Sequence, residues 1–493
     1  MSPVHCDAIV IGSGAGGSAT AYRLVLAGLR VVLLEKGAQL PKDGSTLNVA
    51  QVVHKRRFLS REPWLDGRGR RITPEEHFNV GGKTKWYGAA LLRFAEAEFL
   101  PDPEYGCLGW PITAEDLSPY YEEAERLLGV RSFLSENDLR HILAGLCNVD
   151  SGWYAQAMPM GLAAEIAADP VEAAHFDGFA SAKDLKGEAD RSLLAAVRLR
   201  ENFQLIINAE VKQLIGAPQS PAMVTGVRLA DGRELYAPRI FLAAGALHSP
   251  RLLANYLANC GLARTLPIAA HVGRYLKLHL LTAMVAFSPG KKRDLIRKTT
   301  LLTHPHHPHS SVQPLGFDGE LIATLLPKVL PQGVRRMLGT RAYGFFLQTE
   351  DGSDARNRVI QDTDETRPPV LDYDDVRIPV ASREHRSFAR AFQRGLARAG
   401  MVSFTRRVGL SGTAHVCGSL VCGHSSADSV VDSQGRVHGM QGLYVVDGSV
   451  LPRSSRVNPS LTIYAWGLRV GDLVAREFQR QTTLSTREPS HVA

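Results

Sequence analysis

Long apolar runs are absent from this chain of 493 residues, and so are internal repeats and long low-complexity segments. No apolar run reaches the roughly 18 residues that a membrane-spanning helix requires, so we do not expect stable insertion into a membrane. The chain opens with MSPVHCDAIVIG, which holds neither a basic segment nor a cleavage site before the first apolar strand. Without such a signal, the expected location is the cytoplasm.

Cysteine is scarce too, and the charge has no strong pattern. Six cysteines in so long a chain do not form a disulfide framework, which agrees with a reducing compartment. The formal net charge of +8 is spread along the chain, and no alternation of basic and aromatic residues indicates a nucleic-acid-binding module. The length and composition predict a mildly basic globular enzyme of two or three lobes, with no nucleic-acid partner.

The most informative segment spans residues 7–36, DAIVIGSGAGGSATAYRLVLAGLRVVLLEK. A short apolar strand runs into Gly12, Gly14 and Gly17, followed by a helix and a second apolar strand that ends at Glu35. This order predicts a dinucleotide-binding βαβ unit, whose glycines allow a tight turn, close approach of a pyrophosphate and close helix–strand packing. The helix N-terminus offers free N–H groups to the phosphates. Glu35 is placed to bind a ribose diol and repels a 2′-phosphate, which predicts FAD or NAD rather than NADP.

Later segments return the backbone toward the nucleotide. A second glycine-rich element, FNVGGKTKWYGAALLRF, occupies residues 78–94. From residue 203 the sequence reads as alternating strands, with an Asp-Gly turn at Asp231 and Gly232. A strand over residues 239–246 then meets the helix of HSPRLLANYL. We expect this strand-to-helix turn to approach the nucleotide as well.

Residues 288–345 are basic and broken by proline, and we interpret them as an insertion or a substrate lobe. The amphipathic stretch 320–338, ELIATLLPKVLPQGVRRML, is expected to pack over a pocket; the alternative is a helix on a membrane surface. In HPHHPH, residues 304–309, proline prevents the i, i+4 pairing of helical metal ligands. We therefore expect a solvated loop there, and no metal site.

Near the C-terminus the sequence predicts a buried helix that begins at a site. Pro459 suits the first helical position and Asn458 the N-cap, and the following SLTIYAWGLRVGDLV is apolar nearly all round. A helix N-terminus stabilises an anion by about 0.3–2 kcal/mol, so the start of this helix suits a site where negative charge forms. The polar residues after this helix are expected to form a frayed tail.

Several motifs resemble those of the glucose-methanol-choline (GMC) flavoprotein oxidoreductases, over nearly the whole chain. They are VGGKTKWYGAALLR, FLAAGALHSPRLL, NRV at residues 357–359, HVCGSLVCG and VDGSVLPRSSRVNPSLT. The details look most like the bacterial, choline-dehydrogenase-like branch. The resemblance implies an α/β protein with a Rossmann-like FAD-binding domain and a discontinuous α+β substrate-binding domain on a mixed or antiparallel sheet. The first domain would comprise residues 1–105, 203–276 and 424–480, the second 106–202 and 277–423, and 481–493 would be a flexible tail.

The resemblance also implies a catalytic pair. The family's active-site His, and its His or Asn before Pro in an NPxxT motif, match His415 and Asn458. A neutral imidazole takes the hydroxyl proton while the carbon delivers hydride to flavin N5, and the amide holds the alcohol oxygen. His424 and His438 are nearby alternatives for the base. Arg456 either binds an acidic substrate or forms a structural ion pair, and we expect the ion pair.

Two departures from the family concern the flavin. Many members attach it covalently through a His in the second glycine element; the matching residue is Trp86, which predicts noncovalent FAD. Tyr87 stands where relatives often carry Asn, which changes the contacts around N5 and C4a of the flavin.

Cys417 and Cys422 are interpreted as buried hydrophobic residues rather than a redox pair or metal ligands. The residues expected to bind FAD are Gly12, Gly14, Ala15, Gly17, Glu35, Lys36, Gly81, Gly82, Thr84, Tyr87, Gly88, Ala89, Ala90, Val211, Ala244, Gly245, Asp447, Gly448, Asn458, Pro459 and Thr462.

The predicted activity is oxidation of an alcohol, including a sugar or polyol, to the carbonyl by proton abstraction and hydride transfer to FAD. A dehydrogenase that uses a quinone or cytochrome is favoured over an oxidase that uses oxygen, although no residue decides the acceptor. Two alternatives stay open. One is an enzyme of the same fold for an apolar alcohol, such as a sterol or long-chain alcohol, at a membrane surface. The other is a non-catalytic flavin-binding protein.

Overall fold

The computed structural model describes residues 6–362, 364 and 367–485. A parallel sheet runs in the order β20 (Leu443–Val445), β12 (Ile240–Leu242), β1 (Ala8–Ile11), β2 (Val31–Leu34) and β8 (Phe203–Ile206). All residues of β1 and β2 are buried, as expected for strands whose sheet is covered on both faces. The βαβ unit predicted for residues 7–36 is therefore confirmed at the centre of this sheet.

Two helices that are far apart in sequence lie against each other beside this sheet: α1 (Ala15–Leu26) and α10 (Ser460–Ser485). Glycines allow the close contact, since a Cβ on Gly467 would lie 2.5 Å from the Gly16 carbonyl oxygen. The Thr20 hydroxyl donates to the Gly467 carbonyl at 3.0 Å. Helix α10 includes residues 481–485 of the predicted tail, and residues 486–493 lie outside the described part of the chain.

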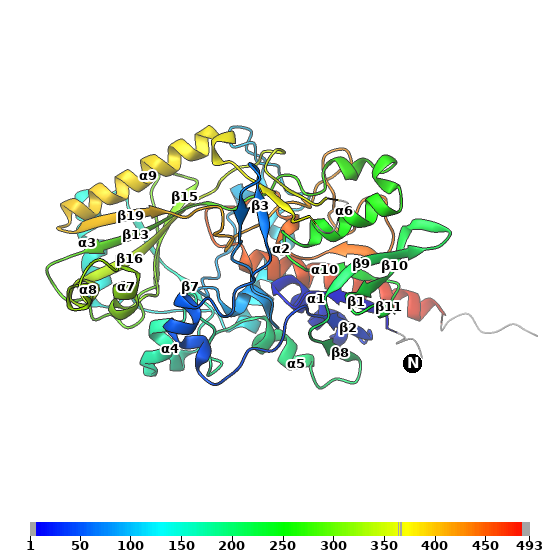
Figure 1. Cartoon of the computed structure of the whole chain (residues 1–493), viewed down its shortest axis with the longest axis horizontal. Coiled ribbons are helices and arrows are strands. Elements are labelled where there is room, and N and C mark those ends of the chain that lie inside the picture. The colour runs from blue at the N-terminus through cyan, green and yellow to red at the C-terminus, as the bar shows by residue number, and fades with distance from the viewer. Residues whose placement is uncertain (1–5, 363, 365–366, 486–493) are drawn as a thin grey trace, which may run out of the picture.

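The other large sheet is antiparallel throughout. Its order is β19 (Val402–Arg407), β13 (Leu280–Phe287), β16 (Ala342–Thr349), β15 (Ser310–Pro314), β14 (Thr300–Thr303) and β6 (Tyr154–Ala157). Helix α9 (Pro379–Arg398) packs on this sheet, and α3 (Asn137–Val149) packs against α9. Figure 1 shows this lobe, with α9 in yellow, beside the part that contains β1, β2 and the red helix α10.

Smaller elements complete the fold. The predicted Asp-Gly turn joins two strands of a three-stranded sheet, β9 (Val211–Ala217), β10 (Ser220–Leu229) and β11 (Glu234–Tyr236), and Gly232 has φ +86°. A four-stranded sheet contains β17 (Arg358–Ile360), β18 (Val370–Asp372), β3 (Trp64–Asp66) and β4 (Arg71–Ile72), and β5 (Arg131–Ser132) pairs with β7 (Pro159–Met160). The other helices are α2 (Ala114–Leu128), α4 (Pro170–His175), α5 (Ala195–Val197), α6 (Ser249–Asn259), α7 (Gly319–Leu325) and α8 (Gln332–Gly339).

The two large sheets divide the sequence as the predicted domains do. Strands of the parallel sheet come from the three segments assigned to FAD binding, and strands of the antiparallel sheet come from the two segments assigned to substrate binding. Helix α2 belongs to segment 106–202 but packs against α10, where the Tyr120 hydroxyl donates to Asp472 at 2.8 Å. The domain limits themselves stay a prediction. None of the helices in the described residues combines the length and apolarity needed to cross a bilayer.

Candidate active site

A cavity of about 850 Å³ lies between the parallel sheet and the antiparallel lobe. It is lined by residues 11–16, 34–36, 243–246 and 447–448, at and just beyond the carboxyl ends of β1, β2, β12 and β20, and by residues 86–90 of the second glycine element. Ligands of open α/β sheets bind beyond the carboxyl ends of the strands. The cavity has the position and size expected of a cofactor and substrate site.

The first glycine turn presents backbone to this cavity. Gly12 has φ +105°, and a Cβ there would lie 2.3 Å from the Ala243 carbonyl oxygen, so only glycine fits. Gly14 is the N-cap of α1 without a side-chain cap, and a Cβ on it would meet no atom within 4 Å. The first N–H groups of α1 have no partner within the helix, which suits a pyrophosphate. The residues present therefore fit the phosphate part of FAD.

Glu35 follows β2 and lines the cavity. Its carboxylate accepts hydrogen bonds from the Ser13 hydroxyl at 2.6 Å, the Ser13 N–H at 3.1 Å and the Gly37 N–H at 2.9 Å. Burial raises the pKa of Glu35, and these bonds oppose the rise. The carboxylate is thus held in one orientation, with acceptor capacity left for a ribose diol. Ser13 was not predicted, because the position between the first two glycines of the motif accepts many residue types.

The second glycine element lies against the first. Gly81, at φ +87°, donates its N–H to the Ser13 hydroxyl at 3.0 Å. Trp86 lines the cavity, stacks on His77 with ring centroids 4.6 Å apart, and donates its indole N–H to Asn79 at 2.9 Å. Residues 86–90 then form the wall that the sequence predicted to contact the flavin.

His415 and Asn458 meet at the cavity wall although 43 residues separate them: the Asn458 amide donates to His415 Nε2 at 3.0 Å. Gln313 of β15 donates to the Asn458 side-chain oxygen. His415 Nδ1 is buried and has no hydrogen-bond partner among the described residues. Buried polar atoms nearly always have a partner, so this orphan suits a bound group.

Asn458 was expected to cap the helix, and that expectation is wrong. The Pro459 carbonyl accepts the first helical bond, from the Ile463 N–H at 3.1 Å, so the helix begins one residue later. The Asn458 side chain bonds to His415 and Gln313 instead. Because the Asn458 side chain does not cap the helix and instead contacts a histidine that lines the cavity, we infer that it has a role in the site.

The surroundings keep His415 uncharged. Burial lowers its pKa well below 6.5, and His279, Lys298 and Lys83 lower it further. The His279 ring packs edge-on at 5.1 Å, and its Nε2–H donates to the Ser455 carbonyl at 2.9 Å. A neutral imidazole with a lone pair on one nitrogen can accept a proton.

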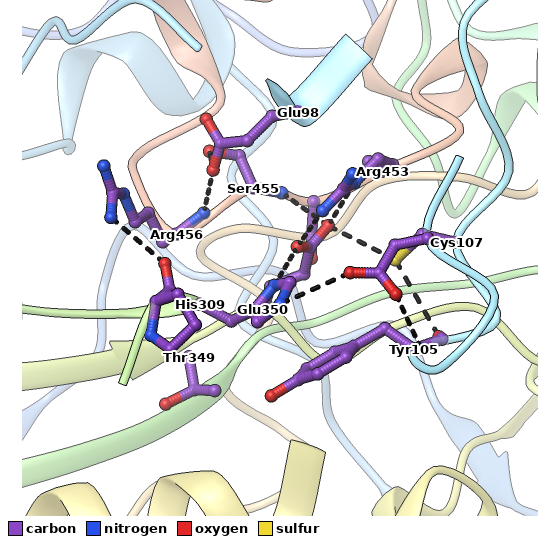
Figure 2. A network of polar contacts seen from close by, with 12 residues as sticks. Glu98, Tyr105, Cys107, His309, Thr349, Glu350, Arg453, Ser455 and Arg456 are labelled. Carbon is purple, nitrogen blue, oxygen red and sulfur yellow. Dashed lines mark hydrogen bonds and ion pairs between the residues drawn. The ribbon is translucent and has the colours of Figure 1, made fainter. Parts of the chain in front are cut away.

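A buried polar network holds the loop that carries Asn458 (Figure 2). Glu350, which follows β16, accepts two hydrogen bonds from Arg453, at 2.7 and 3.0 Å, and one from His309 at 3.0 Å. The Ser455 N–H also donates to it, at 3.3 Å. Burial alone would raise the pKa of Glu350, but the bonds from His309 and Arg453 hold it well below its usual value. The ion pair therefore ties this loop to the antiparallel lobe at neutral pH.

Most of the residues predicted to bind FAD line the cavity, and three lie behind its wall. Gly17 provides the predicted close packing, since a Cβ there would lie 2.0 Å from the Gly12 carbonyl oxygen. Gly81 contacts Ser13, as described, and Thr462 shares a hydrogen bond with the Tyr121 hydroxyl at 2.7 Å. The cavity-lining residues are Gly12, Gly14, Ala15, Glu35, Lys36, Gly82, Thr84, Tyr87, Gly88, Ala89, Ala90, Val211, Ala244, Gly245, Asp447, Gly448, Asn458 and Pro459.

The other histidines considered as the base, and Arg456, lie outside the cavity wall. His424 is exposed, and His438 contacts Ser429 at 3.2 Å; neither lines the cavity. Arg456 donates through its guanidinium to the Pro308 carbonyl at 3.1 Å and forms no ion pair among the described residues, contrary to expectation. His415 is therefore the base candidate that the structure retains.

Cys417 and Cys422 are unpaired and buried, and burial raises the pKa of both thiols. They pack in the large hydrophobic core, as predicted.

The loop expected at residues 304–309 is present, with Pro305, His306 and Pro308 exposed, but two of its histidines are buried rather than solvated. His304 and His307 are 7% and 8% exposed, and both pack among the aromatic rings of Trp153 and Phe388. Proline excludes a helix from this segment but does not prevent burial against α9. Within the described part of the chain, no three His, Cys, Asp or Glu side chains are grouped so that they could hold a metal ion.

Only the first part of the stretch 320–338 packs over the pocket as predicted, since Val329, Val334 and Met337 further along are exposed and do not line it. Helices α7 and α8 flank the segment that contains Pro327, and Leu321 and Leu325 of α7 line the cavity. Proline divides the amphipathic stretch into two short helices because it cannot continue a helical hydrogen-bond pattern.

Comparisons with known proteins agree with this geometry. Sequence profiles described as GMC oxidoreductase and FAD dependent oxidoreductase match residues 354–467 and 7–175. The 6‴-hydroxyparomomycin C oxidase of Streptomyces lividus is 30% identical, over 95% of this chain and 91% of its own. The chain belongs to the GMC oxidoreductase family.

As a GMC oxidoreductase, it is an FAD-dependent enzyme that acts on the CH–OH groups of small-molecule alcohols or sugars. Paromamine 6′-oxidase from Streptomyces fradiae is 26% identical over 95% of this chain and 92% of its own. Formate oxidase from Aspergillus oryzae RIB40 shares the fold, with a TM-score of 0.69 at 15% identity over 97% of this chain and 100% of that one. The predicted family and cofactor are confirmed, while the choline-dehydrogenase-like branch stays a prediction.

Trp86 predicts that this GMC oxidoreductase releases its FAD on denaturation. The nearby His77 ring stacks on Trp86, and its Nδ1 lies 2.9 Å from the Phe58 carbonyl, so it is held by the protein itself. Acid precipitation of the yellow protein should leave FAD in the supernatant in equimolar amount. Colour that stays with the precipitate would contradict noncovalent binding.

Proposed function

We propose that the enzyme oxidises a primary or secondary hydroxyl to the carbonyl, with His415 as the base and Asn458 as the group that orients the alcohol. The observation that carries this proposal is the 3.0 Å contact between His415 Nε2 and the Asn458 amide, in the wall of the cavity that also contains the dinucleotide-binding glycines. A relative named for a 6‴-hydroxy compound supports a hydroxylated substrate.

Each residue has one task in the proposed reaction. Bound FAD supplies the acceptor for the hydride that leaves the carbinol carbon. Neutral His415 accepts the hydroxyl proton, so the alcohol loses two electrons and two hydrogens in total. The Asn458 N–H group donates to the alcohol oxygen, and Gln313 fixes the amide by donating to its oxygen. The N-terminal end of α10, where Pro459 lines the cavity, stabilises negative charge there by about 0.3–2 kcal/mol.

Anaerobic reduction of the bound flavin tests the activity. The purified enzyme is mixed without oxygen with primary and secondary alcohols, polyols and sugars, and the loss of flavin absorbance is recorded. At least one compound should bleach the flavin and yield one carbonyl per flavin reduced. If dithionite bleaches the flavin and none of the alcohols does, the non-catalytic alternative is favoured.

The pH dependence follows from the lowered pKa of His415. The base must be uncharged, and its pKa lies below 6.5, so the limiting rate of flavin reduction should stay constant above that pH. On acidification the rate should fall only as the imidazole takes up a proton, which places the midpoint on the acid side of 6.5. Anaerobic stopped-flow measurements from about pH 5 to 9 check this. A midpoint above 6.5 would exclude His415 in this environment as the base.

A further inference from the structure

A buried ion pair faces the cavity from the antiparallel lobe, apart from the catalytic pair. Lys298 Nζ donates to Asp177 Oδ2 at 3.0 Å, and the Gly316 N–H donates to the same oxygen at 3.0 Å. The side chains of Lys298 and Asp177 are 6% and 12% exposed, and both line the cavity. Because burying a charged pair costs solvation energy, a pair in this position requires an explanation.

Lys298 and Asp177 have donors and acceptors that no described residue uses. Among the described residues, Asp177 Oδ1 accepts no hydrogen bond, and Lys298 donates only the one to Asp177. A lysine ammonium has three donors and a carboxylate oxygen can accept two bonds, so an open donor and an open acceptor lie side by side. A hydroxyl group both donates and accepts. It therefore fits this pair better than an ammonium, which Lys298 repels, or a carboxylate, which Asp177 repels.

The loop that carries Asp177 is anchored to the wall of the flavin site. Lys186 is 1% exposed and donates to the carbonyls of Phe176 and Phe179, on either side of Asp177, at 2.7 and 2.5 Å. It also donates to the Tyr87 carbonyl at 2.9 Å. One buried ammonium thus ties the acid to the second glycine element.

The surroundings of Gly88 show that Asp177 and Lys298 lie directly against the second glycine element. A Cβ on Gly88 would lie 2.2 Å from Asp177 Oδ1 and 2.3 Å from Lys298 Nζ, so a larger residue there would displace the pair. The other cavity-lining residues from segments 106–202 and 277–346 are all glycine, leucine or phenylalanine. In these two segments, Asp177 and Lys298 are therefore the polar side chains of the cavity wall, while Gln361 and His415 line it from further along the chain.

We propose that Asp177 and Lys298 form a subsite for a second, uncharged hydroxyl of the substrate. The enzyme then selects polyhydroxylated alcohols, such as sugars and polyols, over simple alcohols of the same size. This inference rests on the proposed function, since the hydroxyl to be oxidised lies at His415 and Asn458.

Two matched probes test the subsite: cyclohexylmethanol, and methyl hexopyranosides, which carry the same hydroxymethyl group on a hydroxylated six-membered ring. Anaerobic stopped-flow gives an apparent Kd for each, and calorimetry gives a Kd that does not depend on turnover. The wild-type enzyme should bind at least one hexopyranoside more tightly than cyclohexylmethanol. Lys298→Met and Asp177→Asn should each raise the Kd of that hexopyranoside by about 10- to 100-fold. The same variants should change the Kd of cyclohexylmethanol by less than about threefold.

Two further variants keep the test decisive. Removing one partner leaves the other charge buried and unpaired, so Asp177→Leu/Lys298→Met replaces both and should reverse the preference toward cyclohexylmethanol. Lys183→Met, which breaks an exposed pair with Asp169 outside the cavity, should leave both Kd values unchanged.

The results also separate this subsite from the proposed function. Failure of every alcohol to bleach the flavin would refute the activity, while calorimetry would still report the preference for the hydroxylated ring. Tighter binding of cyclohexylmethanol by the wild-type enzyme would overturn the subsite and favour an apolar substrate. Equal changes for both probes in the Asp177 and Lys298 variants would overturn it too, because a pair that contacts the flavin affects all alcohols alike.

Discussion

Replacing His415 with alanine lowers the limiting rate of anaerobic flavin reduction by about two to four decades and leaves FAD bound. The rate falls because, among the described residues, His415 is the base that contacts the Asn458 amide N–H, with Nε2 at 3.0 Å. FAD stays bound because the glycine turn and Glu35 hold the other parts of the cofactor. Stopped-flow absorbance gives the rate, and the visible spectrum of the purified variant gives the FAD content.

His438→Ala is the matched control for this variant. His438 lies 23 positions further along the chain and contacts Ser429 rather than the cavity, so its removal should change the reduction rate little. A near-normal rate for His415→Ala would remove His415 from the mechanism. A large loss for His438→Ala would show that the base had been assigned to the wrong histidine.

Arg453→Met is expected to destabilise the protein by about 3–5 kcal/mol, because it leaves the Glu350 carboxylate buried without its guanidinium. Glu350 is 0% exposed, and its pKa is held well below the usual range, so the carboxylate is charged at neutral pH. The stability that the pair contributes is present at pH 7 and is lost only in strong acid, as the pH falls through the lowered pKa. Urea unfolding at pH 7 measures the loss.

The same variant should slow flavin reduction in the fraction that remains folded, since Arg453 anchors the loop that carries Asn458. Arg233→Met breaks an exposed pair with Asp231 and should change the stability much less than Arg453→Met does. The double variant Glu350→Leu/Arg453→Met should recover part of the stability, because it removes both buried charges. Equal stability of Arg453→Met and Arg233→Met would show that the buried pair does not fix the loop.

The nucleotide-binding part of the fold was predictable because its signals are local. Gly12, Gly14 and Glu35 lie within one βαβ unit, where spacing alone decides which residue reaches the turn, the phosphates and the ribose. The Asp231–Gly232 turn is local in the same sense: Gly232 has φ +86°, a conformation that glycine adopts without strain. Such features need no knowledge of the tertiary structure.

The polar residues of the antiparallel lobe could not be predicted in this way. Asp177 and Lys298 are 121 positions apart, and Glu350 and Arg453 are 103 apart, so neither pair leaves a periodic or spaced signal in the sequence. The burial of His304 and His307 was not predicted for a related reason. The composition of their segment indicated an exposed loop, whereas packing against α9 buries these two side chains. His415 was found only through family resemblance, because a lone histidine carries no signal of its own.

The most direct test of the central claim is a crystal structure of the holoenzyme with a bound, unreactive alcohol analogue. We expect the flavin ring between residues 86–90 and the His415–Asn458 pair, and an analogue oxygen within hydrogen-bonding distance of His415 Nε2 and the Asn458 amide. An analogue oxygen that contacts neither side chain, or a flavin ring on another wall of the cavity, would contradict it.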